Sequence, residues 1–243
     1  MIDHLTITMP YYEAPEMLKT HLENWCSYPD DLADKVDIVL IDDGSPKYPA
    51  AEVLKASKLP RSPIKLFRVL ENIPWNHGGA RNLGMHCVSE GWVLSTDIDH
   101  VLTVDNLERL MSLPLDPFKS YRPGRVQENE NGTECIKPHR ETFIMTREMF
   151  WKIGGFDEDF NGYWNGVFYP FLKNVKRICS VIALNEVNLL WKCDFKDATV
   201  QEWGRIGSKW DINVNLEMRS KQHKAARNYQ PTNPLRFNWE QVR

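Results

Sequence analysis

Four short apolar runs, separated by segments with helical spacing, constrain the fold of this chain more than any other feature. Each run is rich in branched or other apolar side chains, which is typical of a parallel strand buried on both faces. The runs are Leu5–Met9, Val36–Ile41, Ile64–Leu70 and Trp92–Thr96. Between the first two, Glu16–Trp25 places its apolar side chains on one helical face. Strands that alternate with helices predict a parallel α/β sheet with right-handed crossovers.

The pattern changes after about Pro114. Residues 114–140 are rich in Pro, Gly, Asn and charged side chains, which predicts loops or a short hairpin. The elements expected beyond them are a strand at Phe143–Met145, a helix at Thr146–Ile153 with Thr146 as its N-cap, strand structure within Val175–Leu184, a helical region at 200–229 and an irregular tail from Gln230. The sequence contains no repeat and no obvious linker, so one domain is the simplest arrangement.

Composition argues against several classes of protein. The 243 residues carry 30 Lys and Arg against 33 Asp and Glu, a net charge of −3 that favours neither nucleic acid nor membrane binding. Five cysteines, with no Cys-x-x-Cys spacing, argue against a disulfide framework and a structural zinc site. The first residues lack the features of a signal peptide, and no stretch is long enough for a membrane-spanning helix. We therefore expect a cytoplasmic protein without a transmembrane segment.

Polar motifs follow three of the four predicted strands at the point where each strand ends. They are Pro10-Tyr11, Asp42-Asp43-Gly44-Ser45 and Asp97-Ile98-Asp99. Ligands of parallel α/β sheets bind beyond the carboxyl ends of the strands. The three motifs should therefore meet at one edge of the sheet and line one ligand site.

Asp97 and Asp99 stand two residues apart just beyond a buried strand, where both carboxylates can face one cleft. Two such charges repel each other, and a divalent cation removes the repulsion. Carboxylate oxygens are hard ligands that suit Mn²⁺ or Mg²⁺, with diphosphate oxygens and water filling the other positions. An isolated acidic pair of this kind is, however, more often a turn or capping feature.

Two further motifs admit both a functional and a structural interpretation. In Asp42-Asp43-Gly44-Ser45, a carboxylate can accept hydrogen bonds from a base N–H or a ribose hydroxyl, or it can form an Asx-type turn. The run His77-Gly78-Gly79-Ala80-Arg81-Asn82 opens a helix whose N–H groups favour an anion. Arg81 can reach a phosphate or pair with one of the motif carboxylates.

Taken in order, five motifs resemble those of the family 2 glycosyltransferases of the GT-A fold. They are Pro10-Tyr11, Asp42-Asp43-Gly44-Ser45, Gly79-Ala80-Arg81-Asn82-x-Gly84, Asp97-x-Asp99 and Gly154-Gly155-Phe156-Asp157-Glu158. The resemblance spans roughly residues 1–170. It implies a GT-A fold, a mostly parallel central sheet flanked by helices, within a single domain at 1–243. That domain would comprise a Rossmann-like nucleotide-sugar-binding half at about 1–112, an acceptor-side half at 113–200, and a C-terminal helix and tail at 200–243.

The resemblance also implies an activity. A member of this family moves a sugar from a nucleoside-diphosphate sugar, with UDP favoured, to a hydroxyl on a glycan, lipid-linked or protein acceptor, commonly with inversion. Mn²⁺ or Mg²⁺ would be the cofactor, held by Asp97 and Asp99, and Asp97 would also touch the ribose or donor sugar. The remaining nucleotide-site residues implied by the motifs are Pro10, Tyr11, Asp42, Asp43 and Arg81.

One departure from the family leaves the catalytic base open. The family often has a Glu-Asp pair shortly after Gly-Gly-Phe-Asp-Glu, and the Asp deprotonates the acceptor. Here the expected carboxylates fall near Gly166 and Val167. A carboxylate must reach the acceptor hydroxyl, so Asp157, with Glu158 and Asp159 beside it, is the first substitute. Asp157 can equally cap a turn.

A second departure concerns the third metal ligand, often a His near the last strand of the family's fold. This chain has no His there, so Asp194, Cys193 or His100 would have to serve, or the diphosphate and water would complete the coordination.

Two rival functions stay open on sequence alone. A sugar nucleotidyltransferase shares the layout but usually carries a Gly-rich basic loop after the first strand, where this chain has Pro10-Tyr11-Tyr12-Glu13. A non-catalytic nucleotide-sugar or glycan-binding module would account for the missing Glu-Asp pair. Donor hydrolysis or transfer with Mn²⁺, abolished by Asp99→Ala, would separate an enzyme from a binding module.

Overall fold

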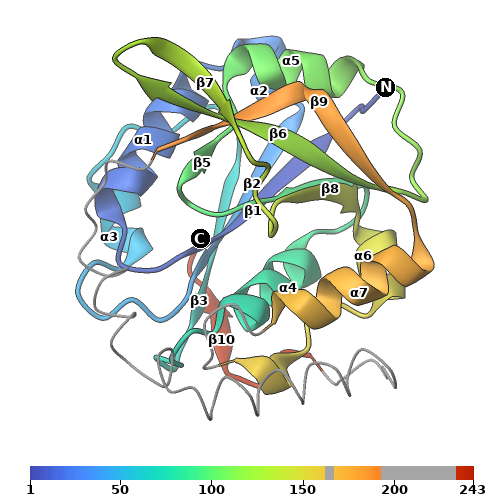
Figure 1. Ribbon diagram of the computed structural model, residues 1–243. Helices are drawn as coiled ribbons and strands as arrows, with labels where there is room; N and C mark the ends of the chain where they lie inside the picture. The colour runs from blue at the N-terminus through green and yellow to red at the C-terminus, as the bar shows by residue number, and fades with distance from the viewer. Residues whose placement is uncertain (162–166, 193–233) are drawn as a thin grey trace.

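The computed structural model describes residues 1–161, 167–192 and 234–243. A ten-stranded central sheet runs through them, with the strand order β10-β3-β2-β1-β4-β8-β6-β9-β5, and β7 pairs with β6. Helices pack against both faces of this sheet (Figure 1). The predicted α/β class is confirmed.

The parallel part of the sheet is built from the four apolar runs. It contains β1 (Leu5–Tyr11), β2 (Val36–Asp42), β3 (Ile64–Val69) and β4 (Trp92–Ser95). β1 pairs with both β2 and β4, and β2 pairs with β3, all in parallel. The helices between the strands are α1 (Pro15–Cys26), α2 (Asp30–Ala33), α3 (Ala50–Lys55) and α4 (His77–Cys87). Because each strand is almost wholly buried, its apolar run needs no polar alternation.

The rest of the sheet is mixed. Its strands are β5 (His100–Val101), β6 (Ser120–Asn129), β7 (Gly132–Ile136), β8 (Phe143–Thr146) and β9 (Val181–Trp191). β6 and β7 form the hairpin predicted for residues 114–140. β8 runs antiparallel to β4 and joins this part of the sheet to the parallel part.

Two local predictions are wrong. The segment from Val175 to Leu184 was expected to be strand, but its first part lies in α7 (Phe168–Ile178), and strand structure begins only at Val181. Phe168, Phe171 and Val175 recur at helical spacing and are buried, so packing decides in favour of a helix. The tail was expected to be irregular, but it contains β10 (Trp239–Gln241), which pairs antiparallel with β3. The helical region predicted at 200–229 lies outside the described residues.

Two hydrophobic cores lie on opposite faces of the sheet. One contains the buried sides of α1 and α5 (Val104–Ser112), and the other those of α4, α6 (Arg147–Ile153) and α7. Thr146 caps α6 as predicted, because its Oγ1 accepts a hydrogen bond from Met149 N at 3.2 Å. No helix in the described part of the chain is both long enough and apolar enough to span a bilayer.

The antiparallel β4–β8 pair determines what faces the end of β4. Ser95, the last residue of β4, lies opposite Phe143, the first residue of β8. The residues before β8 therefore meet the residues after β4, and Thr96 Oγ1 lies 3.3 Å from Thr142 Oγ1. In this way the second half of the chain reaches the Asp97-x-Asp99 turn.

Candidate active site

The loops that follow β1 and β2 are tied together by polar contacts. Asp43 N donates to Tyr11 O at 2.9 Å. Tyr11 itself is fully buried in the core, and its O–H donates to Tyr48 O at 2.5 Å. Pro10, half-buried, precedes it at the end of the strand. Tyr11 thus lies beneath the loops that carry the motifs and packs in the core below them.

Asp42 and Asp43 have different surroundings. Asp42 Oδ1 accepts from Ser45 N at 2.8 Å and Oδ2 accepts from Ala50 N at 2.9 Å, so this carboxylate closes the turn between β2 and α3. Asp43 Oδ1 accepts only from Asn76 Nδ2, at 2.8 Å, among the hydrogen bonds of the described residues. Burial raises the pKa of Asp43 to about 7 even though Asn76 and His77 act in the opposite direction.

Arg81 and Asp97 form a buried ion pair. The Arg81 side chain, 0% exposed, contacts Asp97 Oδ1 through Nη2 and donates to Ser95 Oγ at 2.7 Å through Nη1. The sequence left two roles open for Arg81, binding a phosphate or pairing with a motif carboxylate, and the structure shows the pairing. His77 Nε2 lies 2.9 Å from Asp97 Oδ1, and His139 Nδ1 lies 3.3 Å from Asp97 Oδ2. Burial alone would raise the pKa of Asp97, but Arg81 and His77 hold it well below its usual value.

His77 joins Asp97 to a third carboxylate, that of Glu141. His77 Nδ1 lies 2.9 Å from Glu141 Oε2 and forms an ion pair with it. Burial opposes protonation of His77, yet Glu141 and Asp97 together raise its pKa to about 9. In the same way burial would raise the pKa of Glu141, but His77 lowers it. His77 is therefore a cation between two carboxylates at neutral pH.

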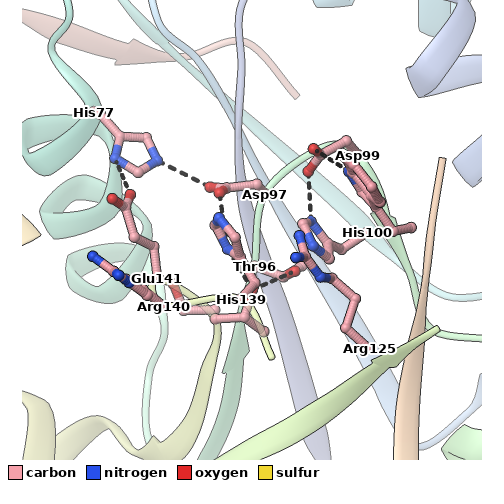
Figure 2. A network of polar contacts seen from close by, with 12 residues as sticks. His77, Thr96, Asp97, Asp99, His100, Arg125, His139, Arg140 and Glu141 are labelled. Atoms are coloured by element: carbon pink, nitrogen blue, oxygen red, sulfur yellow. Dashed lines mark hydrogen bonds and ion pairs between the residues drawn. The ribbon is translucent and has the colours of Figure 1, made fainter. Parts of the chain in front are cut away.

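Asp99 is the most accessible carboxylate of the Asp97-x-Asp99 turn, with 41% of its side chain exposed against 22% for Asp97. Its Oδ1 accepts from His100 Nδ1 at 2.5 Å and its Oδ2 accepts from Trp191 Nε1 at 3.0 Å. His100 stacks against His139 with 4.6 Å between ring centroids. Figure 2 shows Asp99, Asp97 and Glu141 in a row, with His77 between the last two.

The carboxylates of this cluster fit a hard divalent cation at Asp99. Each Asp99 oxygen accepts one hydrogen bond and keeps a second lone pair for a metal. In the described segments Asp97 Oδ2 has one ion-pair contact, His139 Nδ1 at 3.3 Å, whereas Arg81 and His77 both contact Oδ1, so Oδ2 is the oxygen more open to a metal. Mn²⁺ and Mg²⁺ prefer such oxygen ligands.

A second grouping could in principle hold a metal. His77, Asp97 and Glu141 offer ligand atoms within 4.8 Å of one another, the one such group of three in the described segments. The Arg81 guanidinium contacts Asp97, and its Nε lies 3.2 Å from His77 Nε2, so a cation there would face a fixed positive charge. We therefore assign this group to charge pairing and not to metal binding.

The two predicted catalytic carboxylates lie near the C-terminal segment. Asp157 is buried and caps the short helix η1 (Glu158–Phe160) by accepting from Asp159 N at 3.1 Å. Glu158 is also buried, and Oε1 accepts from Asn82 Nδ2 and Leu235 N, both at 2.8 Å, while Oε2 accepts from Arg236 N at 3.1 Å. The geometry thus gives Glu158 an anchoring function, and a catalytic role for either residue stays a prediction.

Sequence reasoning missed His139, Glu141 and Trp191 as members of the site. No strand-end signal marks them, because they reach the cluster through the antiparallel β4–β8 and β5–β9 pairs. The only signal available was charge directly before the predicted strand at Phe143–Met145. Of the candidate third metal ligands, His100 bonds Asp99, whereas Asp194 and Cys193 lie outside the described residues.

Solved structures with this fold are glycosyltransferases. A mannosyltransferase from Pyrobaculum calidifontis in complex with GDP-Man and Mn²⁺ matches with a TM-score of 0.60 and 14% identity, over 96% of this chain and 66% of that one. S. aureus TarS 1-349 in complex with UDP-GlcNAc matches at 0.61 and 12%, over 81% and 61%. GalNAc-T7 with UDP, GalNAc and Mn²⁺ matches at 0.62 and 15%, over 93% and 56%. The chain therefore spans about two thirds or less of these structures, and the likeness establishes a GT-A fold.

Comparison of sequences identifies the family. A search of curated protein sequences finds no significant match. The model of the family "Glycosyl transferase family 2", however, matches residues 6–172, which is well over half of the chain and includes all five motifs. The chain is therefore a member of glycosyltransferase family 2.

Proposed function

We propose that this protein transfers a hexose from a nucleoside-diphosphate sugar to an acceptor hydroxyl, with a divalent metal held at Asp99. The observation that carries the proposal is the continuous polar edge from Asp43 through Asn76 and His77 to Asp97. Asp43 follows β2 and Asp97 follows β4, and the N-cap and first residue of α4, Asn76 and His77, join them. A nucleotide lying along this edge would place its base at one end and its diphosphate at the other.

Asp43 is the group proposed to bind the base. Its carboxyl is buried and accepts one side-chain hydrogen bond, which leaves lone pairs for a base N–H or a ribose hydroxyl. Two of the three solved structures named above contain UDP or a UDP-sugar and one contains GDP-Man. We favour a UDP-sugar donor.

Asp99, with Asp97, is proposed to hold Mn²⁺ or Mg²⁺. Such an ion, when bound, neutralises the charge that develops on the departing diphosphate. The residues of the chain set its position: His100 and Trp191 fix the Asp99 carboxylate, and Arg81 fixes Asp97. The rigid carboxylates preorganise the site for the leaving group, and that is where electrostatic catalysis is most effective.

The second half of the chain is proposed to bind the acceptor, a glycan, lipid-linked sugar or protein, and the reaction to invert the anomeric centre. The four described cysteines are free thiols, which supports the proposed cytoplasmic location. A non-catalytic binding module is the alternative that the missing Glu-Asp pair leaves open.

A donor screen tests the proposal. UDP-glucose, UDP-GlcNAc, UDP-GalNAc and GDP-mannose are each added with and without Mn²⁺, and both the melting temperature and the release of nucleoside diphosphate are measured. We expect one donor to raise the melting temperature only with Mn²⁺, by an amount that grows with occupancy, and to be turned over. Stabilisation without turnover would support the binding module instead, and no stabilisation by any donor would contradict both.

A further inference from the structure

The proposed transfer needs a group that accepts the proton of the acceptor hydroxyl. A carboxylate suits this task if it lies within hydrogen-bond reach of that hydroxyl. Around the Asp97-x-Asp99 turn the described segments place three carboxylates, those of Asp97, Asp99 and Glu141, whereas Asp43 lies at the end of the edge proposed for the base. Asp97 is bound by Arg81, His77 and His139, and Asp99 faces the metal position. Only Glu141 has no task in donor binding.

We propose that Glu141 is the general base of this glycosyltransferase, an inference that rests on the proposed function. Glu141 takes the proton from the acceptor hydroxyl, whose oxygen forms the new bond to the anomeric carbon of the donor sugar. The bond between that carbon and the diphosphate oxygen breaks, and its electron pair leaves with the nucleoside diphosphate. Glu141 ends protonated and returns the proton to solvent, so atoms and charge balance.

The position of Glu141 in the cluster supports this role. Its side chain is 14% exposed, and Oε2 is held 2.9 Å from His77 Nδ1. In the described part of the chain no hydrogen bond or ion pair occupies Oε1, which is therefore available to a hydroxyl. Figure 2 shows Glu141 on the far side of Asp97 from Asp99. With the diphosphate at Asp99 and the donor sugar at Asp97, the acceptor would approach from the side of Glu141.

A chain of contacts through His77 and Gly78 links Glu141 to one of the positions that lack the expected carboxylate. Val167, one of the two positions where the family resemblance puts that carboxylate, packs against Gly78: a Cβ added to Gly78 would lie 2.9 Å from Val167 Cγ1. Gly78 directly follows His77, the residue that pairs with Glu141. The carboxylate missing from the helix α7 side is thus supplied by the segment before β8.

His77 is a positioning residue in this arrangement. It bridges Asp97 and Glu141 and holds the Glu141 carboxylate at a fixed distance from the donor-sugar side of the site. Asp157 and Glu158, in contrast, are buried in the contacts of η1 and of the C-terminal segment.

The test uses the full chain, Mn²⁺ and the donor chosen by the screen above, with water or added sugars as acceptors. The variants are Glu141→Gln and Glu141→Ala, with the exposed α6 residue change Glu148→Gln as the matched control. Donor turnover should fall roughly 10²–10⁴-fold in both Glu141 variants, while the Kd for UDP with Mn²⁺ changes by less than about twofold. Glu148→Gln should leave both quantities unchanged.

Azide separates a base from a structural role. Azide is a nucleophile that needs no deprotonation, so it should restore donor turnover in Glu141→Ala and yield the glycosyl azide. Glu141→Gln with turnover within about tenfold of wild type, a parallel loss of UDP affinity, or no azide rescue would each overturn the proposal. If wild type turns over none of the donors, the proposed function itself fails, whereas normal turnover in Glu141→Gln defeats only the assignment of the base.

Discussion

Asp43 is a single residue whose burial affects the stability of the chain in a pH-dependent way. Its carboxyl group is buried, and its pKa is raised from 3.8 to about 7. Between these two pH values the folded chain holds a proton that the unfolded chain releases. The stability associated with that proton is therefore full below about pH 4 and lost as the pH rises through 7. At higher pH the buried charge is a cost that a nucleotide base donating to it would relieve.

Asp43→Asn should therefore stabilise the chain at high pH. We expect a gain of about 2–4 kcal/mol in the free energy of unfolding at pH 8, and less than about 1 kcal/mol at pH 4. The same variant should bind UDP more weakly, because an amide oxygen is a poorer acceptor than a carboxylate. Urea unfolding at the two pH values checks the first part, and an equal gain at both would show that Asp43 does not titrate as described.

The sequence alone predicted the places of the strand-end carboxylates and of Arg81. The carboxylates directly follow recognisable apolar runs, and Arg81 lies at the start of a recognisable helix. Asp43, Arg81 and Asp97 lie along one edge, as the alternation of strands and helices predicts. Glu141 and His139 were not accessible. Their place depends on β8 pairing antiparallel with β4, which is decided by long-range packing and leaves no periodic trace in the segment 114–140.

At the scale of elements, several motif residues serve packing between elements as well as chemistry. Asn82 on α4 donates to Phe156 O at 2.9 Å and accepts from Phe156 N at 2.8 Å, which ties α4 to the Gly-Gly-Phe-Asp-Glu turn. Gly84 lets α4 approach β1, because a Cβ there would collide with Thr8 Oγ1. Two residues of the motif Gly79-Ala80-Arg81-Asn82-x-Gly84 thus hold α4 against the sheet and against the Gly-Gly-Phe-Asp-Glu turn.

Gly84→Ala should lower stability by about 1–3 kcal/mol, since overpacking outweighs the better helix propensity of alanine. In a Thr8→Ala background the collision is removed, and the same change should become neutral or stabilising by up to about 1 kcal/mol. Chemical unfolding of the four proteins of this double-mutant cycle measures the coupling. Equal effects in both backgrounds would mean that α4 does not rest on Thr8.

The C-terminal strand depends on one buried carboxylate. Glu158 binds the N–H groups of Leu235 and Arg236, just before β10. Glu158→Gln should weaken this anchor, and the amides of Trp239–Gln241 should exchange with deuterium about ten times faster or more, because each lost charged hydrogen bond is worth roughly 1.5–3 kcal/mol. Asp159→Asn removes only an exposed ion pair with Arg236 and should change exchange little. Similar protection in wild type and Glu158→Gln would contradict the anchor.

Elements of the first half, and β8 and α6 of the second, followed from the sequence, whereas α7 and β10 did not. The four strands of the parallel part were predicted within one or two residues, because buried runs and amphipathic helices carry strong local signals. The run at Val175–Leu184 carries β-branched residues, but burial of Phe168, Phe171 and Val175 on one face makes its first part helical. β10 is only three residues long, and it pairs with β3 at a point where Trp239 packs edge-on against Phe67.

At the scale of the whole molecule, one continuous sheet unites the edge proposed to bind the donor and the half proposed to bind the acceptor. The parallel strands bring Asp43, Asp97 and Asp99 to one edge, and β8 and β9 carry Glu141 and Trp191 to the same edge from the second half. A chain with a net charge of −3 gains little long-range attraction for a dinegative diphosphate. Donor affinity should therefore depend on a local cation.

Metal-dependent UDP binding at Asp99 is the central claim, and calorimetry of UDP with and without Mn²⁺ tests it most directly. We expect wild type to bind UDP at least about tenfold more tightly with Mn²⁺ than without, as loss of one charged ligand contact implies. Asp99→Asn should lose this metal dependence, while its circular dichroism stays that of wild type. Two results would contradict the assignment of the metal to Asp99. One is a Kd for UDP that is the same with and without Mn²⁺ in wild type, and the other is the full Mn²⁺ dependence of that Kd retained in Asp99→Asn.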